Sequence, residues 1–333
     1  MNFRSLEDLA QTLRRNLHRI PHDIDVVVGV PRSGMIPASM LALHRNVALT
    51  DVDGLLEGRA LQPGIRRRKD RIRREPETWQ NVLVIDDSVG TGGTLAEVRA
   101  RIAAAGRAWN VRYCGVYGTT DDPPGIDLNL ELCPLPRVFE WNLMHHPHVL
   151  ADACLDIDGL LCVDPTAEEN DDGPLYERFL RDACAALLPT VPVGTLVSSR
   201  LEKSRAATED WLHRHGVQYG ELCLLDLPSA EERRRLKAHA PFKAEVYSSK
   251  KRSWLFLESE PAQAREIAAR SGKAVICTAD MTLFDETASQ RAVRVLRHSL
   301  GAKKRTLWRL KARLWDAVNQ QLRYADRRVE DRD

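Results

Sequence analysis

Short apolar runs separated by helix-like segments form the main pattern of this chain. Three runs rich in valine lie in its first half, DVVVGV, NVLVID and NVRYCGVYG, and each is bounded by turn-forming or polar residues. Continuous apolar strands that alternate with helices are typical of a parallel sheet covered on both faces. The first half therefore predicts an α/β fold with a mainly parallel sheet.

The same alternation begins again after residue 148. The second series of predicted strands comprises VLADACLDID, GTLVSSR, ELCLLD, SWLFLE and KAVICT, and helical stretches such as LEKSRAATEDWLHRHG lie between them. The stretch from Pro134 to Pro147 contains three prolines and is the expected junction. We therefore expect two tandem α/β domains, over residues 1–147 and 148–285.

Two segments do not follow this alternation. Residues 58–80 show almost no apolar periodicity and are rich in arginine from Arg66 to Arg74, and a loop of this length is usually functional or disordered. In the tail, residues 286–333, leucines and a valine share one helical stripe with two tryptophans beside it. The tail predicts a basic amphipathic helix, and packing on its own domain or on a dimer partner is the favoured role.

Composition and charge narrow the classes of function. The 49 basic and 47 acidic residues leave a net charge of +2, which is too small to indicate a nucleic-acid binder. The seven cysteines show no CxxC spacing, so neither a zinc site nor a disulfide framework is suggested. No apolar run approaches the roughly 20 residues that span a bilayer, and the N-terminus is charged throughout. We expect a cytoplasmic protein without a membrane span.

The segment VLVIDDSVGTGGTL joins an apolar strand to two carboxylates and a glycine-rich turn. Asp86 and Asp87 precede glycines interleaved with hydroxyl side chains, and a predicted helix follows. Glycines let backbone N–H groups approach anionic oxygens, and the helix N-terminus adds partial positive charge. No GKS or GKT string follows, so the segment is not a P-loop. The pattern predicts a phosphate site whose carboxylates hold ribose hydroxyls or orient a magnesium ion.

This segment closely resembles the signature with which type I phosphoribosyltransferases bind phosphoribosyl pyrophosphate (PRPP). The resemblance implies that Asp86 and Asp87 are catalytic and that Asp87 contacts Mg²⁺. It also implies that PRPP is bound by Ser88, Val89, Gly90, Thr91, Gly92, Gly93 and Thr94. The reaction would be displacement of pyrophosphate from the anomeric carbon, helped mainly by positioning and charge screening.

The same resemblance implies a second loop, which binds the pyrophosphate group. The string VVVGVPRSGMIPA lies where the family has this loop, often with a non-proline cis peptide, and places Arg32, Ser33 and Gly34 in it. Arg32 would neutralise the leaving pyrophosphate. The stretch from Arg66 to Arg74 lies where the family has a flexible loop that closes over the active site, and a solvated charge run is the alternative.

The acceptor is less well defined than the donor. The string RVFEWNLMHH resembles a strand that helps some members bind a purine, so Phe139 and Trp141 are candidates to stack on the acceptor. A core role for one of them is the alternative. The string TDVDGLLEGR, with Asp51 and Asp53, departs from the purine-salvage members. We therefore expect only a nucleobase-like small molecule.

A second acidic motif follows the first predicted strand of the second domain. In CLDIDGLLC, Asp156 and Asp158 are two residues apart, so both can face one side of the strand end. Such a pair suits phosphoryl transfer: Asp156 can attack phosphorus, and Asp158 can protonate the leaving oxygen and then activate water. The string resembles the first motif of the haloacid dehalogenase (HAD) superfamily of phosphatases.

The HAD resemblance implies further site residues. Ser198 and Lys243 would bind the phosphate, with Lys243 also acting in catalysis, and Glu258 would join Asp156 and Asp158 in binding Mg²⁺. Glutamates at 258 and 260 replace the usual aspartates, which puts the metal site in doubt. A HAD fold retained without catalysis is the alternative for this domain.

Two functions follow from these motifs. The favoured one is a bifunctional enzyme that attaches phosphoribose to a small-molecule acceptor and then dephosphorylates the product, with PRPP and Mg²⁺ as ligands. The alternative is a PRPP-binding regulatory or RNA-binding protein with a non-catalytic HAD scaffold. Nucleic acid is the less favoured partner, and a homodimer is left open.

Overall fold

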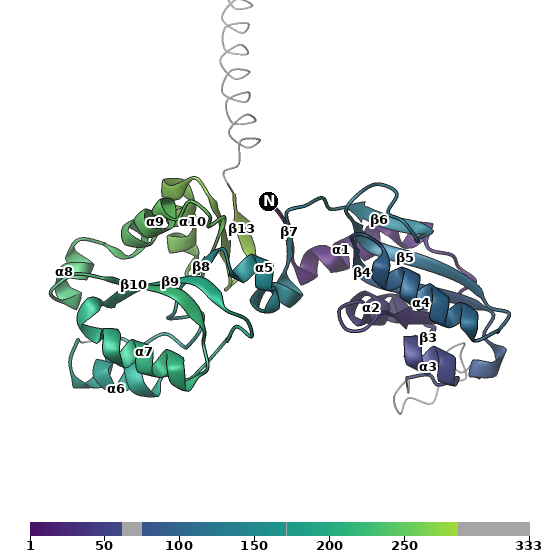
Figure 1. The fold of residues 1–333 in the computed structure, drawn as a ribbon, viewed down its shortest axis with the longest axis horizontal. Helices are drawn as coiled ribbons and strands as arrows, with labels where there is room; N and C mark the ends of the chain where they lie inside the picture. Colours follow the sequence, from purple (N-terminus) through teal and green to yellow (C-terminus); the bar gives the residue numbers. More distant parts are fainter. Residues whose placement is uncertain (62–74, 171, 286–333) are drawn as a thin grey trace, which may run out of the picture. The chain divides into compact units, whose positions relative to one another are not determined.

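The computed structural model describes residues 1–61, 75–170 and 172–285, and the chain divides into two compact units. The first unit comprises Met1–Asp152 with the short segments Leu187–Gly194 and Leu212–Gly220, and the second comprises Ala153–Ala186, Thr195–Trp211 and the described residues from Glu221 onward (Figure 1). The stretch from Arg66 to Arg74 and the predicted helix of the tail lie outside the described residues.

A five-stranded parallel sheet forms the centre of the first unit. Its strand order is β3-β2-β4-β5-β6. The strands are β2 (Val26–Gly29), β3 (Ala48–Asp51), β4 (Asn81–Val89), β5 (Asn110–Gly118) and β6 (Leu128–Leu132). A separate pair of parallel strands joins β1 (Asn2–Arg4) to β7 (Arg137–Phe139).

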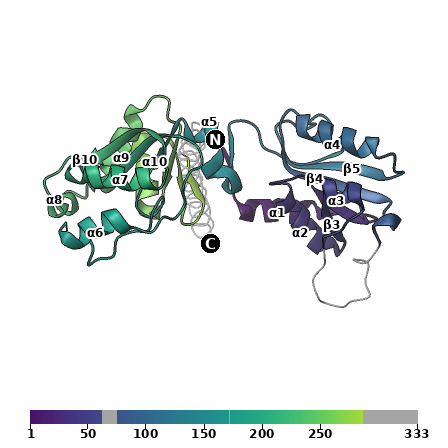
Figure 2. The ribbon, with the colours of Figure 1, turned by 60° about the horizontal axis from the view of Figure 1, so that its bottom comes forward.

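Helices cover both faces of this sheet. They are α1 (Leu6–Asn16), α2 (Met35–Arg45), α3 (Val52–Glu57) and α4 (Gly93–Ala104). The unit also contains the short helix α5 (Pro147–Leu150) and 3₁₀ turns at η1 (Leu17–Arg19), η3 (Pro76–Thr78) and η4 (Glu140–His145). Figure 2 shows α4 and α2 on opposite sides of the strands. Val27 packs in the core beneath α1 and α2, whereas its neighbours Val26 and Val28 pack in the core beneath α3 and α4. Both faces of β2 are therefore buried, which explains its unbroken run of valines.

The second half of the chain forms a six-stranded sheet in the order β10-β9-β8-β11-β12-β13. The strands are β8 (Ala153–Leu155), β9 (Val193–Leu201), β10 (Tyr219–Leu225), β11 (Leu255–Glu258), β12 (Ala274–Cys277) and β13 (Thr282–Phe284). β8 pairs in parallel with both β9 and β11, β11 pairs in parallel with β12, and β13 pairs antiparallel with β12. The prediction of α/β folds with mainly parallel sheets is confirmed.

The helices of this half also lie on two sides of the sheet. They are α6 (Pro174–Asp182), α7 (Arg205–Arg214), α8 (Ala230–Arg235), α9 (His239–Ser249) and α10 (Pro261–Ser271), with a 3₁₀ turn at η5 (Glu202–Ser204). Figure 1 shows α9 and α10 on one side and α6 and α7 on the other. Within the described ranges, no helix combines the length and apolar character that a membrane crossing requires.

Candidate functional sites

The two predicted carboxylates of the first unit are buried near the end of β4. Asp86 is 8% exposed and Asp87 is 3% exposed. Asp87 accepts hydrogen bonds from Ser33 Oγ and from Trp141 Nε1, each at 2.7 Å, and Asp86 Oδ1 accepts the backbone N–H of Asp87 at 2.9 Å. The fold therefore brings together residues from three of the segments that the sequence singled out.

Burial changes the acid–base behaviour of this pair. Burial, followed by the negative charge of Asp87, raises the pKa of Asp86 from 3.8 to about 8. A carboxyl group in such a position keeps its proton at neutral pH unless a cation or hydrogen-bond donors stabilise the ionised form. The pair thus has the donor chemistry of a site for a hard cation or for sugar hydroxyls.

The glycine-rich turn after β4 has a geometry that suits an anion. Gly92 has φ +79°, and a Cβ there would lie 2.5 Å from the carbonyl oxygen of Pro124, so only glycine fits. Helix α4 begins at Gly93, and the N–H groups of its first turn have no intrahelical acceptor. Most of the predicted PRPP residues here are exposed, but the side chain of Val89 is buried in the core, so only its backbone can face a ligand.

The predicted pyrophosphate loop lies beside the acidic pair. The peptide bond between Pro31 and Arg32 is a non-proline cis bond, as the resemblance implied, and the Arg32 side chain is exposed. A Cβ on Gly34 would lie 2.5 Å from the carbonyl oxygen of Val30 and 2.9 Å from Asp86 Oδ1. Glycine at this position therefore allows the loop to approach the acids.

The two aromatic candidates for acceptor binding have different environments. Phe139 is 5% exposed and stacks with both Tyr117 and Trp141, with centroid distances of 5.5 and 4.9 Å. Its ring is almost fully buried, which matches the core role rather than acceptor stacking. Trp141 is only partly buried and reaches the acidic pair through its N–H.

Sequence reasoning missed one cation near this site. Arg137, two residues before Phe139, donates to the carbonyl oxygen of Tyr117 at 3.1 Å. Burial lowers the pKa of Arg137, while Asp86 and Asp87 act in the opposite direction. The available signal was that an arginine is the first residue of the string RVFEWNLMHH.

Asp51 and Asp53, whose string departs from that of the purine-salvage enzymes, have structural partners. Asp51 accepts the N–H of Gly54 at 2.6 Å and caps α3, and Asp53 forms an ion pair with Arg101. Their presence is explained by helix capping and surface pairing.

In the second unit, a buried lysine joins two of the predicted acids. Lys243 Nζ lies 2.6 Å from Asp156 Oδ2 and 2.7 Å from Glu258 Oε2, and it also contacts Gln263 at 3.0 Å. Burial and then the charge of Glu258 raise the pKa of Asp156 well above its usual range. Burial lowers the pKa of Lys243, but the two carboxylates outweigh burial and hold it above its usual value.

Asp158 is paired separately, with an arginine that the sequence analysis did not identify. Arg200 is fully buried and approaches Asp158 through Nε at 3.1 Å and Nη2 at 2.6 Å. Burial favours the neutral acid, but Arg200 more than offsets it and lowers the pKa of Asp158. Asp158 is therefore held as a carboxylate by Arg200.

The expected magnesium set is not assembled as a metal site. Asp156 and Glu258 share the ammonium group of Lys243, while Asp158 is held by Arg200. In the part of the chain that the structure describes, no group of three or more His, Cys, Asp or Glu side chains is placed to hold a metal ion. The positions around these acids are already filled by protein cations.

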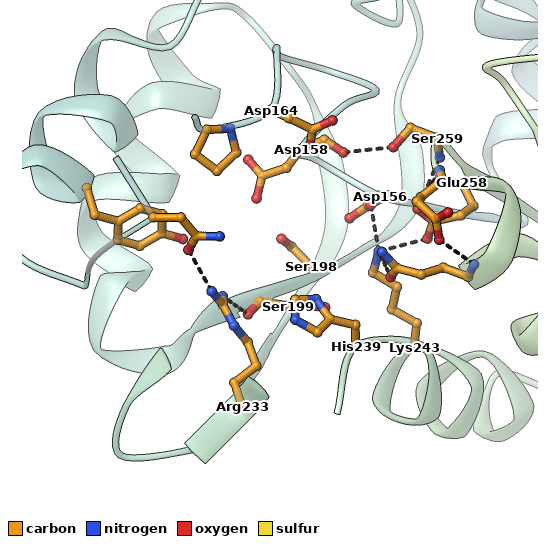
Figure 3. A pocket seen from close by; sticks show the side chains of 15 residues that line it. Asp156, Asp158, Asp164, Ser198, Ser199, Arg233, His239, Lys243, Glu258 and Ser259 are labelled. Carbon is orange, nitrogen blue, oxygen red and sulfur yellow. Dashed lines mark hydrogen bonds and ion pairs between the residues drawn. The ribbon is translucent and has the colours of Figure 1, made fainter. Parts of the chain in front are cut away.

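These residues open onto a pocket of about 300 Å³ within the second unit (Figure 3). Ser198, the predicted phosphate ligand, lines it, and its Oγ accepts the N–H of Arg200 at 3.3 Å. The sequence analysis missed several other lining residues, namely Asn170, Tyr176, Ser199, Arg233 and His239. Glu260 also lines the pocket, and its carboxylate caps α10 by accepting the N–H groups of Ala262 and Gln263.

Comparison with known proteins relates residues 2–118 of the first unit to a known family. Residues 2–118 match the family model of the phosphoribosyl transferase domain, whereas no curated protein matches the chain. One similar solved structure is the xanthine-guanine-hypoxanthine phosphoribosyltransferase of Helicobacter pylori, with 19% identity, 42% of this chain and 92% of that chain covered, and a TM-score of 0.31. Another is the purine phosphoribosyltransferase of Pyrococcus horikoshii, with 21% identity, 42% and 92% covered, and a TM-score of 0.26. Residues 2–118, which contain Asp86 and Asp87, form a domain of the phosphoribosyltransferase family.

Proposed function

We propose that the first unit transfers phosphoribose from PRPP to a nucleobase-like acceptor and releases pyrophosphate. The observation that carries this proposal is the convergence of Asp86 and Asp87 with the glycine turn before α4 and with Ser33 of the neighbouring loop. A phosphate cradle beside paired acids provides binding groups for both a 5′-phosphate and a ribose. The family match of residues 2–118 supports the same reaction class.

Each part of the site has a distinct task in this proposal. Backbone N–H groups from Gly90 to Thr94 hold the 5′-phosphate, and the acidic pair orients the ribose hydroxyls. The exposed Arg32 screens the charge of the departing pyrophosphate. Magnesium bound beside Asp87 would supply further neutralisation of that charge. Because the reaction develops positive charge on the ribose, positioning and fixed electrostatics provide most of the catalysis.

For the second unit, we propose a HAD-like phosphatase domain over residues 148–285. The proposed transferase domain then covers residues 1–147, and the tail covers residues 286–333. Asp156 follows β8, which lies between β9 and β11, and the carboxyl ends of such central strands commonly form binding sites. Asp156 would attack phosphorus, and Asp158 would take a proton from the water that hydrolyses the aspartyl phosphate. Donating a proton to the leaving oxygen would require release of Asp158 from Arg200.

Mass spectrometry of a metabolite extract incubated with PRPP and magnesium tests both activities. The wild type is compared with Asp87→Asn, Asp156→Asn and the control Asp182→Asn, whose carboxylate is exposed at the end of α6. We expect Asp156→Asn to accumulate a phosphoribosylated compound that the wild type and the control dephosphorylate, and Asp87→Asn to form much less of it. Absence of the phosphoribosylated compound from Asp156→Asn, together with absence of its dephosphorylated form from the wild type, would refute the transferase. Identical products from wild type and Asp156→Asn would refute the coupled phosphatase.

A further inference from the structure

The cations of the pocket in the second unit are not equally neutralised. Lys243 lies between the carboxylates of Asp156 and Glu258, and Arg200 pairs with Asp158. Arg233 also lines the pocket, but it donates hydrogen bonds to two neutral oxygens, the carbonyl oxygen of Ser199 and Oδ1 of Asn170. An anion entering this pocket therefore finds its least compensated positive charge at Arg233.

Arg233 is held rigidly at the pocket wall. Its side chain is buried, with the residue 4% exposed. Nη1 donates to the carbonyl oxygen of Ser199 at 2.8 Å, and Nη2 donates to Asn170 Oδ1 at 2.9 Å, as Figure 3 shows. Its Nε has no hydrogen-bond partner. The charge of Asp172 acts on Arg233, but among the described residues no carboxylate accepts a hydrogen bond from its guanidinium, so an anionic ligand would offset part of the penalty of burial.

Two further groups of the pocket wall complement this charge. The hydroxyl of Ser199 is buried and has no hydrogen-bond partner, although Ser199 lines the pocket. His239 lies at the N-terminal end of α9, beside Ser199 and Arg233 in Figure 3. Burial and the charges of Arg233 and Lys243 lower the pKa of His239 to about 4, so its ring is neutral at physiological pH. A neutral imidazole can donate one N–H without adding a proton to the site.

We propose that Arg233, Ser199 and His239 form an oxyanion subsite that binds the phosphate group of a phosphomonoester. Arg233 supplies the charge, the Ser199 hydroxyl and a ring N–H of His239 supply further donors, and Asn170 positions the guanidinium. Lys243 then has a different task from the one its motif implied, because its charge balances the two carboxylates. The identity of the bound group as substrate phosphate rests on the proposed phosphatase function.

Phosphate binding to the full-length protein tests this subsite directly. Isothermal titration calorimetry with inorganic phosphate is carried out on the wild type, Arg233→Gln, Ser199→Ala and the control Arg235→Gln. Arg235 lies on the same short helix but is exposed and pairs with Glu232. A second titration compares ribose 5-phosphate with ribose, which separates recognition of the phosphate from recognition of the sugar.

We expect Arg233→Gln to weaken phosphate binding at least about tenfold and Ser199→Ala about threefold, with Arg235→Gln unchanged. Ser199→Ala removes a buried hydroxyl that has no partner, so it is expected to fold with undiminished stability even if Arg233→Gln does not. Ribose 5-phosphate should bind and ribose should not. The subsite is overturned if the wild type does not bind phosphate, or if Ser199→Ala and a folded Arg233→Gln both bind it as the wild type does.

These outcomes are independent of the transferase experiment, because no PRPP is present. If the variants lose phosphate binding and the wild type dephosphorylates no product, the subsite is supported and the coupled phosphatase is refuted. Dephosphorylation that is equally fast in Ser199→Ala, Arg233→Gln and wild type would remove the subsite and leave the phosphatase.

Discussion

Replacing Asp86 by asparagine should stabilise the first unit, and the gain should grow as the pH rises. In the unfolded chain an aspartate ionises near pH 4, whereas burial and the charge of Asp87 keep Asp86 protonated up to a pKa of about 8. Between these values the folded state binds more protons than the unfolded state. The contribution of this carboxyl to stability is therefore fully present below about pH 4 and is lost as the pH rises to about 8.

The size of the effect follows from the pKa. A rise from 3.8 to about 8 corresponds to an upper limit of about 6 kcal/mol, at 1.4 kcal/mol per pH unit. Relaxation around the buried charge reduces this value, so we expect about 2–4 kcal/mol between about pH 5 and pH 9. Asparagine cannot ionise, and its amide oxygen can still accept the N–H of Asp87 that Asp86 accepts now.

Hydrogen-exchange mass spectrometry on peptides from β4 measures this difference locally within the full chain. Wild type and Asp86→Asn are compared at the same pH, in buffer with a chelator and without PRPP, so that intrinsic exchange rates cancel. Asp122→Asn, at an exposed carboxylate of the same unit, is the control, and its difference in protection from the wild type should not grow with pH. A protection difference that is constant from about pH 5 to pH 9, or that narrows with pH, would refute the reasoning.

Three further changes follow from the geometry. Gly92→Ala should destabilise the protein by about 2 kcal/mol more than Gly125→Ala in thermal unfolding. Both glycines have positive φ, but of the two only a Cβ at position 92 would meet another atom within 4 Å. Equal losses of stability would contradict this steric reasoning. Lys243→Met should lower the free energy of unfolding, measured by chemical denaturation, by about 3–5 kcal/mol, because the two buried carboxylates lose their shared cation. A loss below about 1 kcal/mol would show that the cluster is not ionised as described. Trp141→Phe should preserve the ring stack but remove the N–H that is donated to Asp87. We expect the stability to fall by about 1–3 kcal/mol and the affinity for PRPP to change. An unchanged affinity would show that Trp141 is not part of the PRPP site.

Local patterns along the chain were sufficient to predict the architecture and the positions of the main acids. Runs such as that of β2 are apolar throughout because helices cover both faces of the sheet, and this requirement is visible in the sequence itself. Asp86 and Asp156 were found because chemistry at the end of a strand is encoded within a few consecutive residues. The left-handed conformation of Gly92 has the same local origin.

Only the tertiary structure decided how the charges are paired and which side chains are accessible. Lys243 is 87 residues from Asp156, and Arg200 is 42 residues from Asp158, so no local pattern could reveal that these cations balance the acids. The same is true of Phe139, whose string suggested a ligand contact but whose ring is buried and stacks with two other aromatic side chains. Ionisation, burial and access to a pocket depend on distances through space, and residues far apart in the chain set those distances only when the fold is complete.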